Sequence, residues 1–388
     1  MASMGMLITA IALAASLVQP HGASPARQLA AGGTVPQTLY ASPTGSTIQA
    51  FAQDGPLLAW FSPSTKACNA VWVLSLDNGG RVQLPDETSA ARNVTCRWDA
   101  APPVNLALAG ADVLWTLRDR QATLPFDYVL GAGFKKDTRE RRFQEVAHAK
   151  HGAGLWLGGI AGDSVRTGPQ SVSTLVYGTA AVQYVDEIAC LSGGSCQMKL
   201  AAGGGVYRVV GRPPSVLIPN TRAAVAVSVS GSTLAYVPAG PPDESGRPVA
   251  TADLPIEIVD VGTGTSIAHV SPQGTPVAIA LTPHVLVSLE RTTDGLRLAW
   301  YSATTGGADI GSVAVPAGTT PVLSANDQIA VFRTGRFLHV LTFATGHSRT
   351  VAQTVGQPIG VSLEGSRLAW AENVRGRGRI RALTVNGR

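Results

Sequence analysis

The chain has 388 residues, of which 45% are hydrophobic and 14% are charged, against a usual charged share of about 25%. This balance excludes a disordered chain, which combines low hydrophobicity with high charge, and the 43 Gly and 25 Pro argue against long helices. Lys and Arg number 30 and Asp and Glu 25, but residues 374–388 hold five Arg and no acid. The rest of the chain is therefore formally neutral and lacks the broad basic surface that nucleic acid binding requires.

The N-terminal segment is typical of an export signal. Residues 1–26 contain no Asp, Glu, Lys or Arg, and Met6 to Val18 form an apolar run of 13 residues. A membrane-spanning helix needs about 20 such residues, so the run fits the hydrophobic region of a signal peptide, although no positive charge precedes it. We predict a signal peptide over 1–26, a flexible segment over 27–34 and a secreted or extracytoplasmic protein of the cell envelope. An apolar N-terminal strand and an uncleaved anchor are the alternatives.

Four cysteines follow the leader, and an even number in an exported chain indicates disulfide bonds. Three connectivities are possible, and we favour Cys68–Cys96 and Cys190–Cys196. The second pair encloses Leu-Ser-Gly-Gly-Ser, which turns the chain back on itself. Neither pair has Cys-x-x-Cys spacing and no His is near, so the sequence predicts no metal site.

An internal repeat organises the C-terminal half. A short apolar segment, a polar turn and an apolar triplet recur, and the triplets end at Tyr236, Val287, Val331 and Trp370, spaced 51, 44 and 39 residues apart. The triplet is also found earlier, ending at Trp60, Trp115 and Tyr177. Each unit is too short to bury its own apolar face and must stack on a neighbour, with these seven side chains packed between units.

Further alternating segments ending in Gly turns complete each unit, as in Ile256–Asp260 with Gly262-Thr263-Gly264. Short strands joined by Gly turns at a spacing of about 40–50 residues predict an all-β fold, a β-propeller of four-stranded antiparallel blades over residues 35–388. We predict seven blades. Six or eight remain open, because the repeat lengthens around residues 120–220. The last blade supplies three strands, so we expect a segment around 35–41 to complete it and latch the ring.

The turns Leu76-Asp77-Asn78-Gly79-Gly80 and Val261-Gly262-Thr263-Gly264, each after a strand that begins near a Leu-Ala-Trp-type triplet, resemble those of secreted bacterial propellers of the TolB-like and WD-repeat-like group. The resemblance is diffuse and covers most of residues 45–386. It implies a propeller fold and a protein-binding role, and its motifs specify blades rather than an activity.

No motif indicates chemistry. The turn Asp260–Gly264 is similar to half of a quinone-enzyme repeat, but no Trp follows in 265–270, so we predict no cofactor. His148 and His151 are spaced for a metal on a helix, yet they follow a polar run and we expect a solvated loop. Asp186 and Glu187 are adjacent, which on a strand directs them to opposite faces. No nucleophile elbow or phosphate loop occurs, so we predict no catalytic residue.

Two surface features are candidate binding sites. Arg375, Arg377 and Arg379 alternate with Gly in the last unit and suit an anionic surface such as wall polymer or lipid headgroups. Asp243 and Glu244 lie in the long loop 238–255, and long loops are often functional or disordered.

We therefore expect a monomeric, non-enzymatic scaffold that binds a protein or a cell-envelope polymer, without a transmembrane segment in the mature chain and without nucleic acid. The alternative is a propeller hydrolase or lyase acting on extracellular carbohydrate or a related polymer, with carboxylates or His of different blades meeting at the central channel. A third reading is a wall-associated structural protein anchored by its basic terminus. The lining of the channel mouth separates the first two, because convergent ionisable groups with shifted pKa values favour catalysis.

Overall fold

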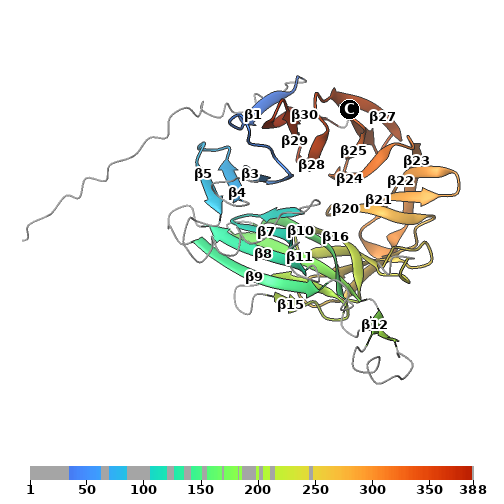
Figure 1. Ribbon diagram of the computed structural model, residues 1–388. Coiled ribbons are helices and arrows are strands. Elements are labelled where there is room, and N and C mark those ends of the chain that lie inside the picture. Colours follow the sequence, from blue (N-terminus) through green and yellow to red (C-terminus); the bar gives the residue numbers. More distant parts are fainter. Residues whose placement is uncertain are drawn as a thin grey trace, which may run out of the picture.

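Alternating apolar residues and Gly turns produce a chain of short antiparallel strands in the computed structural model (Figure 1). The structure describes residues 35–62, 70–84, 105–119, 126–134, 141–150, 155–167, 170–181, 183–185, 198–200, 204–209, 215–243 and 248–386. In this part of the chain the strands form seven four-stranded sheets and one two-stranded sheet.

We number the four-stranded sheets as blades 1 to 7 in chain order. Blade 1 contains β2 (Ala50–Asp54), β3 (Leu57–Ser62), β4 (Ala70–Ser75) and β5 (Arg81–Leu84). Blade 2 contains β6 (Leu106–Ala109), β7 (Asp112–Asp119), β8 (Phe126–Phe134) and β9 (Arg141–Lys150). Blade 3 contains β10 (Leu155–Thr167), β11 (Gln170–Ala181), β14 (Val206–Val209) and β15 (Ser215–Leu217), and β12 (Gln183–Val185) pairs with β13 (Met198–Leu200) beside it in the chain.

The second half of the chain is more regular. Blade 4 contains β16 (Ala224–Ser230), β17 (Thr233–Pro238), β18 (Ile256–Asp260) and β19 (Ser266–Val270). Blade 5 contains β20 (Thr275–Leu281), β21 (Val285–Thr292), β22 (Gly295–Ser302) and, after the 3₁₀ turn η1 (Thr305–Gly307), β23 (Asp309–Val315). Blade 6 contains β24 (Thr319–Ala325), β25 (Ile329–Thr334), β26 (Phe337–Thr342) and β27 (His347–Gln353). Blade 7 contains β28 (Pro358–Glu364), β29 (Arg367–Val374), β30 (Arg377–Thr384) and β1 (Gln37–Ala41).

The seven blades close into a ring. The first strands of successive blades contact one another in the order β2, β6, β10, β16, β20, β24 and β28, and β28 contacts β2 again. Figure 1 shows these blades around a central axis. The chain is thus an all-β propeller with four-stranded antiparallel blades, as the repeat predicts.

The ring is closed by strands from both ends of the described chain. β1 pairs antiparallel with β30, with Gln37 opposite Ala382 and Ala41 opposite Arg379. The segment expected to complete the last blade therefore occupies its outer edge, where a three-stranded blade would otherwise leave unpaired backbone groups on β30.

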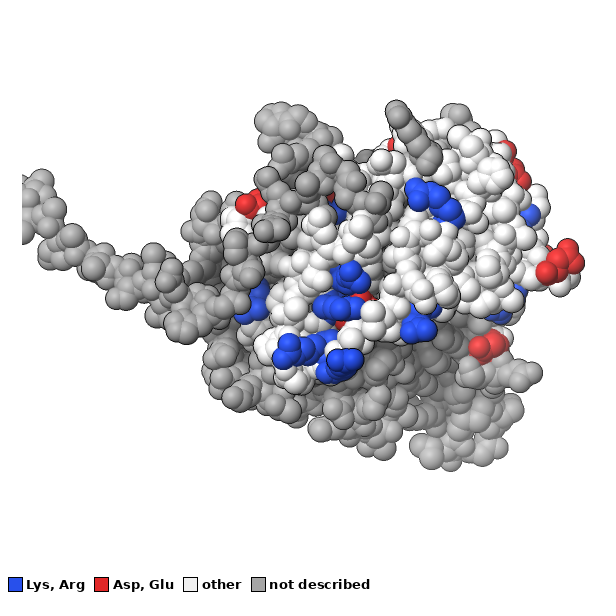
Figure 2. Space-filling model, turned by 90° about the horizontal axis from the view of Figure 1, so that it is seen from above, with Lys and Arg blue, Asp and Glu red and all other residues white. Residues whose placement is uncertain are grey.

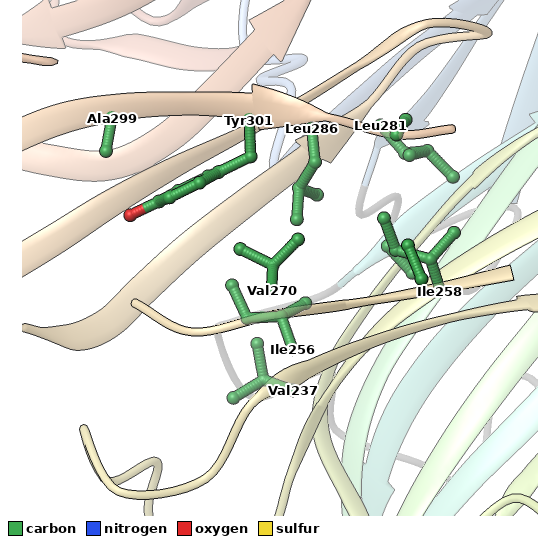
Figure 3. Close-up of a cluster of buried hydrophobic side chains, with 11 residues drawn as sticks. Val237, Ile256, Ile258, Val270, Leu281, Leu286, Ala299 and Tyr301 are labelled. Atoms are coloured by element: carbon green, nitrogen blue, oxygen red, sulfur yellow. The ribbon is translucent and has the colours of Figure 1, made fainter. Parts of the chain in front are cut away.

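The core consists of layers between neighbouring blades. All seven triplet residues are buried, each on the second strand of its blade: Trp60, Trp115, Tyr177, Tyr236, Val287, Val331 and Trp370. Figure 3 shows one layer, in which side chains of blades 4 and 5 interdigitate: Val237, Ile256, Ile258 and Val270 against Leu281, Leu286, Ala299 and Tyr301. Burial of these faces supplies the main favourable free energy of closure.

Several predictions lie outside the described residues. These are the leader and the segment up to residue 34, all four cysteines with their proposed disulfide bonds, Asp186, Glu187, His151 and Glu244. The prediction of a loop at His148 is wrong. This residue lies in β9, which pairs with β8, and Tyr128 of β8 is opposite His148. The polar residues of this segment form a strand at the outer edge of blade 2, although their sequence indicated a loop. None of the helical segments in the described ranges has the length and apolarity that crossing a bilayer requires.

Candidate binding site at the channel mouth

In six blades the turn between the first and second strands, and in blade 3 a segment within β10, lie at one end of the ring and surround a cavity of about 1030 Å³. We call this cavity the channel mouth. Each blade contributes residues of its innermost strand or of the turn after it, and blade 1 adds Asp77 from the β4–β5 turn. The chemistry of the mouth is therefore set by a few short segments: 53–57, 77, 110, 162–165, 228–230, 279–283, 323–327 and 362–365.

Asp54 links three blades at the mouth. It is the last residue of β2, next to Gly55, whose φ of +51° makes the tight turn. Its side chain is 3% exposed, and Oδ2 accepts hydrogen bonds from the Gly110 N–H and the Ser164 hydroxyl, both at 2.5 Å. A carboxylate of blade 1 thus satisfies donors of blades 2 and 3, as a buried carboxylate requires.

Two further carboxylates follow the same plan. Asp163 Oδ2 of blade 3 accepts from the Gly231 N–H of blade 4 at 2.6 Å. Burial raises the pKa of Asp163 above its usual value, and the nearby charge of Asp54 raises it further, against the hydrogen bond from Gly231. Burial likewise raises the pKa of Glu364 of blade 7, with the charges of Asp54 and Asp163 adding to it and the Gly55 N–H opposing it. These three carboxylates therefore lie close enough to repel one another.

Hydroxyl groups repeat at equivalent positions of other blades. Ser228 Oγ on β16 accepts from the Leu281 N–H of blade 5, and Ser324 Oγ on β24 accepts from the Leu363 N–H of blade 7, both at 2.9 Å. In each case a side chain of one innermost strand binds the backbone of the next. These bonds hold the turns in fixed relative positions, so the mouth is a pre-organised surface.

The mouth is acidic. Among the described residues, the lining includes five carboxylates and no Lys, Arg or His: Asp54, Asp77, Asp163, Asp327 and Glu364. Asp77 and Asp327 are exposed. Arg367 adjoins this surface, where it donates to Gln53 Oε1 at 3.1 Å and to the Gly55 carbonyl oxygen. A concave surface with one sign of charge concentrates ligands of the opposite sign, so the mouth suits a cationic group. The described residues hold no grouping of three or more His, Cys, Asp or Glu suited to a metal ion.

The residues singled out by sequence lie elsewhere. Arg375, Arg377 and Arg379 surround the β29–β30 turn, at the opposite end of the blade from the β28–β29 turn that lines the mouth. Asp243 lies in the β17–β18 loop, beside the isolated bridge between Pro242 and Pro248.

Sequence reasoning missed the acidic mouth. A signal was present at two of its positions, where an acid immediately precedes the glycine of the first turn of a unit, as in Asp54-Gly55 and Glu364-Gly365. Asp163 carries no such signal, because it lies within the longer hairpin of β10 and β11.

No family model matches the chain, and no curated protein does. Among solved structures, the chain is similar to the β-propeller domain of Cps50 (Swd1) from Myceliophteria thermophila, with 11% identity over 89% of this chain and 99% of that one and a TM-score of 0.52. It is also similar to BamB from Moraxella catarrhalis, with 11% identity over 87% and 85% of the two chains and a TM-score of 0.41. A third similar structure is the β-propeller domain of the trilobed protease from Pyrococcus furiosus, with 10% identity over 87% of this chain and 95% of that one and a TM-score of 0.47. At these identities the similarity concerns the fold, and the class is that of β-propeller proteins.

Proposed function

We propose that this protein is an exported, non-enzymatic propeller scaffold that binds a protein partner, and that the channel mouth receives a basic segment of that partner. The observation that carries the proposal is the charge of the mouth, whose lining in the described part of the chain has five carboxylates and no basic residue. Lys or Arg side chains of a partner are the complementary groups.

The burial of the carboxylates supports a binding role. Asp54 and Asp163 accept hydrogen bonds from the backbone of neighbouring blades, so both have structural tasks that explain their positions. Asp77 and Asp327 are exposed at the entrance, and although Asp327 Oδ1 accepts from the Thr282 hydroxyl and the His284 N–H, both acids face solvent, where a ligand can meet them. The mouth therefore combines a fixed acidic floor with acids at its edge, an arrangement that favours specificity and fast association.

Peptide binding to charge variants tests the proposal. An octa-arginine peptide, followed by fluorescence anisotropy, is expected to bind the wild type, and D77N/D327N is expected to weaken binding about two- to thirtyfold, from about 0.2–1 kcal/mol per exposed ion pair. The control D253N/D294N removes two exposed acids outside the mouth. It is expected to leave affinity within twofold, because it removes no ion pair with the bound peptide. Equal effects of both variants, or equal binding of an octa-glutamate peptide, would refute the proposal.

A second candidate function is a propeller hydrolase or lyase acting on extracellular carbohydrate. It is favoured by the raised pKa values of Asp163 and Glu364, carboxylates from different blades that adjoin Asp54, because general acids require such shifts. Release of reducing ends from envelope polysaccharide by the wild type, abolished in D163N and E364Q, would favour this function. Peptide binding without such release favours the scaffold.

A further inference from the structure

The end of the propeller opposite the mouth carries arginines in blades 6 and 7. Because the strands are antiparallel, the β25–β26 turn, the β27–β28 connection and the β29–β30 turn all lie at this end. The segments supply four arginines and two apolar side chains. We call this group the basic rim: Arg336, Phe337, Val355, Arg375, Arg377 and Arg379.

Hydrogen bonds join the basic rim across the two blades. Arg336 Nη1 donates to the carbonyl oxygen of Val355 at 3.3 Å. The Val355 N–H donates to Glu372 Oε2, and Arg379 Nε donates to Glu372 Oε1, both at 2.9 Å. The β27–β28 connection is therefore held between Arg336 and the β29–β30 hairpin, and the rim is a continuous surface.

The charge of the rim is largely unneutralised. Glu372 is fully buried and paired with Arg379. None of the ion pairs recorded for the described residues involves Arg336, Arg375 or Arg377, and all three side chains are exposed. Seen from above (Figure 2), Lys and Arg side chains gather over the part of the molecule where Figure 1 places β1, β30 and β27. An excess of positive charge thus remains available to an anionic partner.

Apolar side chains stand next to these charges. Phe337 is 42% exposed and Val355 is 57% exposed. Phe337 follows Arg336 in the chain, and the Val355 carbonyl oxygen accepts a hydrogen bond from Arg336. A soluble polyanion interacts with the charges alone, whereas a lipid surface takes up both kinds of side chain, the arginines at the headgroups and the apolar groups at the acyl boundary.

From these observations we propose that the basic rim docks the propeller on a bilayer surface that contains anionic lipids. Docked in this way, the protein directs its acidic mouth away from the bilayer. In that position the repulsion of the mouth by anionic headgroups is weakest, and a partner has access to it. The proposal does not depend on what the mouth binds, since the two surfaces lie at opposite ends of the blades.

Vesicle sedimentation tests this proposal on the full chain. We expect binding to vesicles of phosphatidylcholine with phosphatidylglycerol, and no binding to phosphatidylcholine alone. R375A/R377A is expected to lower the partition coefficient about 25-fold, at about fivefold per arginine. The control R81A/R349A removes two exposed arginines outside the rim and is expected to bind like the wild type.

A second variant separates the lipid surface from a soluble polyanion. F337S/V355S is expected to reduce the binding that survives when salt is raised from about 0.1 M to 1 M, where surface electrostatics are screened. Both side chains are exposed, so folding is expected to persist, as unchanged thermal unfolding would show. Equal binding to neutral vesicles, no binding to either vesicle, or binding to polyphosphate in the absence of vesicle binding would overturn the proposal.

Discussion

Removal of β1 is the perturbation that tests ring closure. Deletion of residues 35–45 leaves β30 as the outer strand of blade 7. The deletion removes the cross-strand pairs between Gln37 and Ala382 and between Ala41 and Arg379, with two others between them. It also removes the contact of Tyr40 with Trp60, whose ring centroids are 4.3 Å apart.

The structure gives the size of the expected loss. Four pairs at about 1 kcal/mol of net stabilisation each, with about 1 kcal/mol for each of the partly buried Leu39 and Tyr40, amount to about 6 kcal/mol of favourable interactions. At about 1 kcal/mol per residue, the conformational entropy that five ordered residues give up offsets about 5 kcal/mol of this. We therefore expect the free energy of unfolding to fall by about 1 kcal/mol and Tm to fall by roughly 1–2 °C.

Thermal unfolding followed by circular dichroism measures this loss. The control V35S alters a side chain that is 72% exposed and is expected to leave Tm unchanged. A Tm of the deletion variant equal to that of the wild type would refute the reasoning, since it would mean that β1 contributes nothing to closure.

Two further predictions concern the carboxylates of the mouth and the β18–β19 turn. Because the folded-state pKa values of Asp163 and Glu364 are raised, the folded protein binds more protons than the unfolded chain above the usual carboxyl pKa, and its stability falls as the pH rises through the raised values. Urea unfolding from about pH 4 upward is expected to show that the free energy of unfolding declines less steeply in D163N/E364Q than in the wild type. In this variant amide oxygens still accept the backbone hydrogen bonds. The same decline in both proteins would mean that these two carboxylates do not cause it. In the β18–β19 turn, Gly264 has a φ of +68° and an added Cβ would overlap the Pro219 carbonyl oxygen. G264A is expected to cost about 1–3 kcal/mol from its backbone alone, whereas G262A, with Asp260 Oδ1 as its nearest neighbour at 3.3 Å, is the matched control in the same urea titration, and equal losses would contradict the strain.

The fold could be predicted because burial leaves a periodic record in the sequence. A large apolar residue recurs on the second strand of each blade, and Trp60 and Trp370 are recognisable without a structure. The repeat blurs around 120–220 for a physical reason: β10 and β11 have 13 and 12 residues, so their hairpin is longer than those of other blades. Seven four-stranded sheets nevertheless form.

The candidate site was less accessible to sequence reasoning, because its contacts exist only in the closed ring. Asp54 and Ser164 are 110 positions apart and belong to blades 1 and 3, yet they share a hydrogen bond. No local pattern brings such residues together. The arginine series was visible in the sequence, but its relation to Phe337 and Val355 depends on how blades 6 and 7 adjoin.

Amide hydrogen exchange with and without the octa-arginine peptide tests the central claim, that the acidic end of the ring is where a partner binds. The account predicts that added protection is confined to the segments that line the mouth: 53–57, 77, 110, 162–165, 228–230, 279–283, 323–327 and 362–365. Protection centred on the β29–β30 turn, or none in the turns around the cavity, would contradict it.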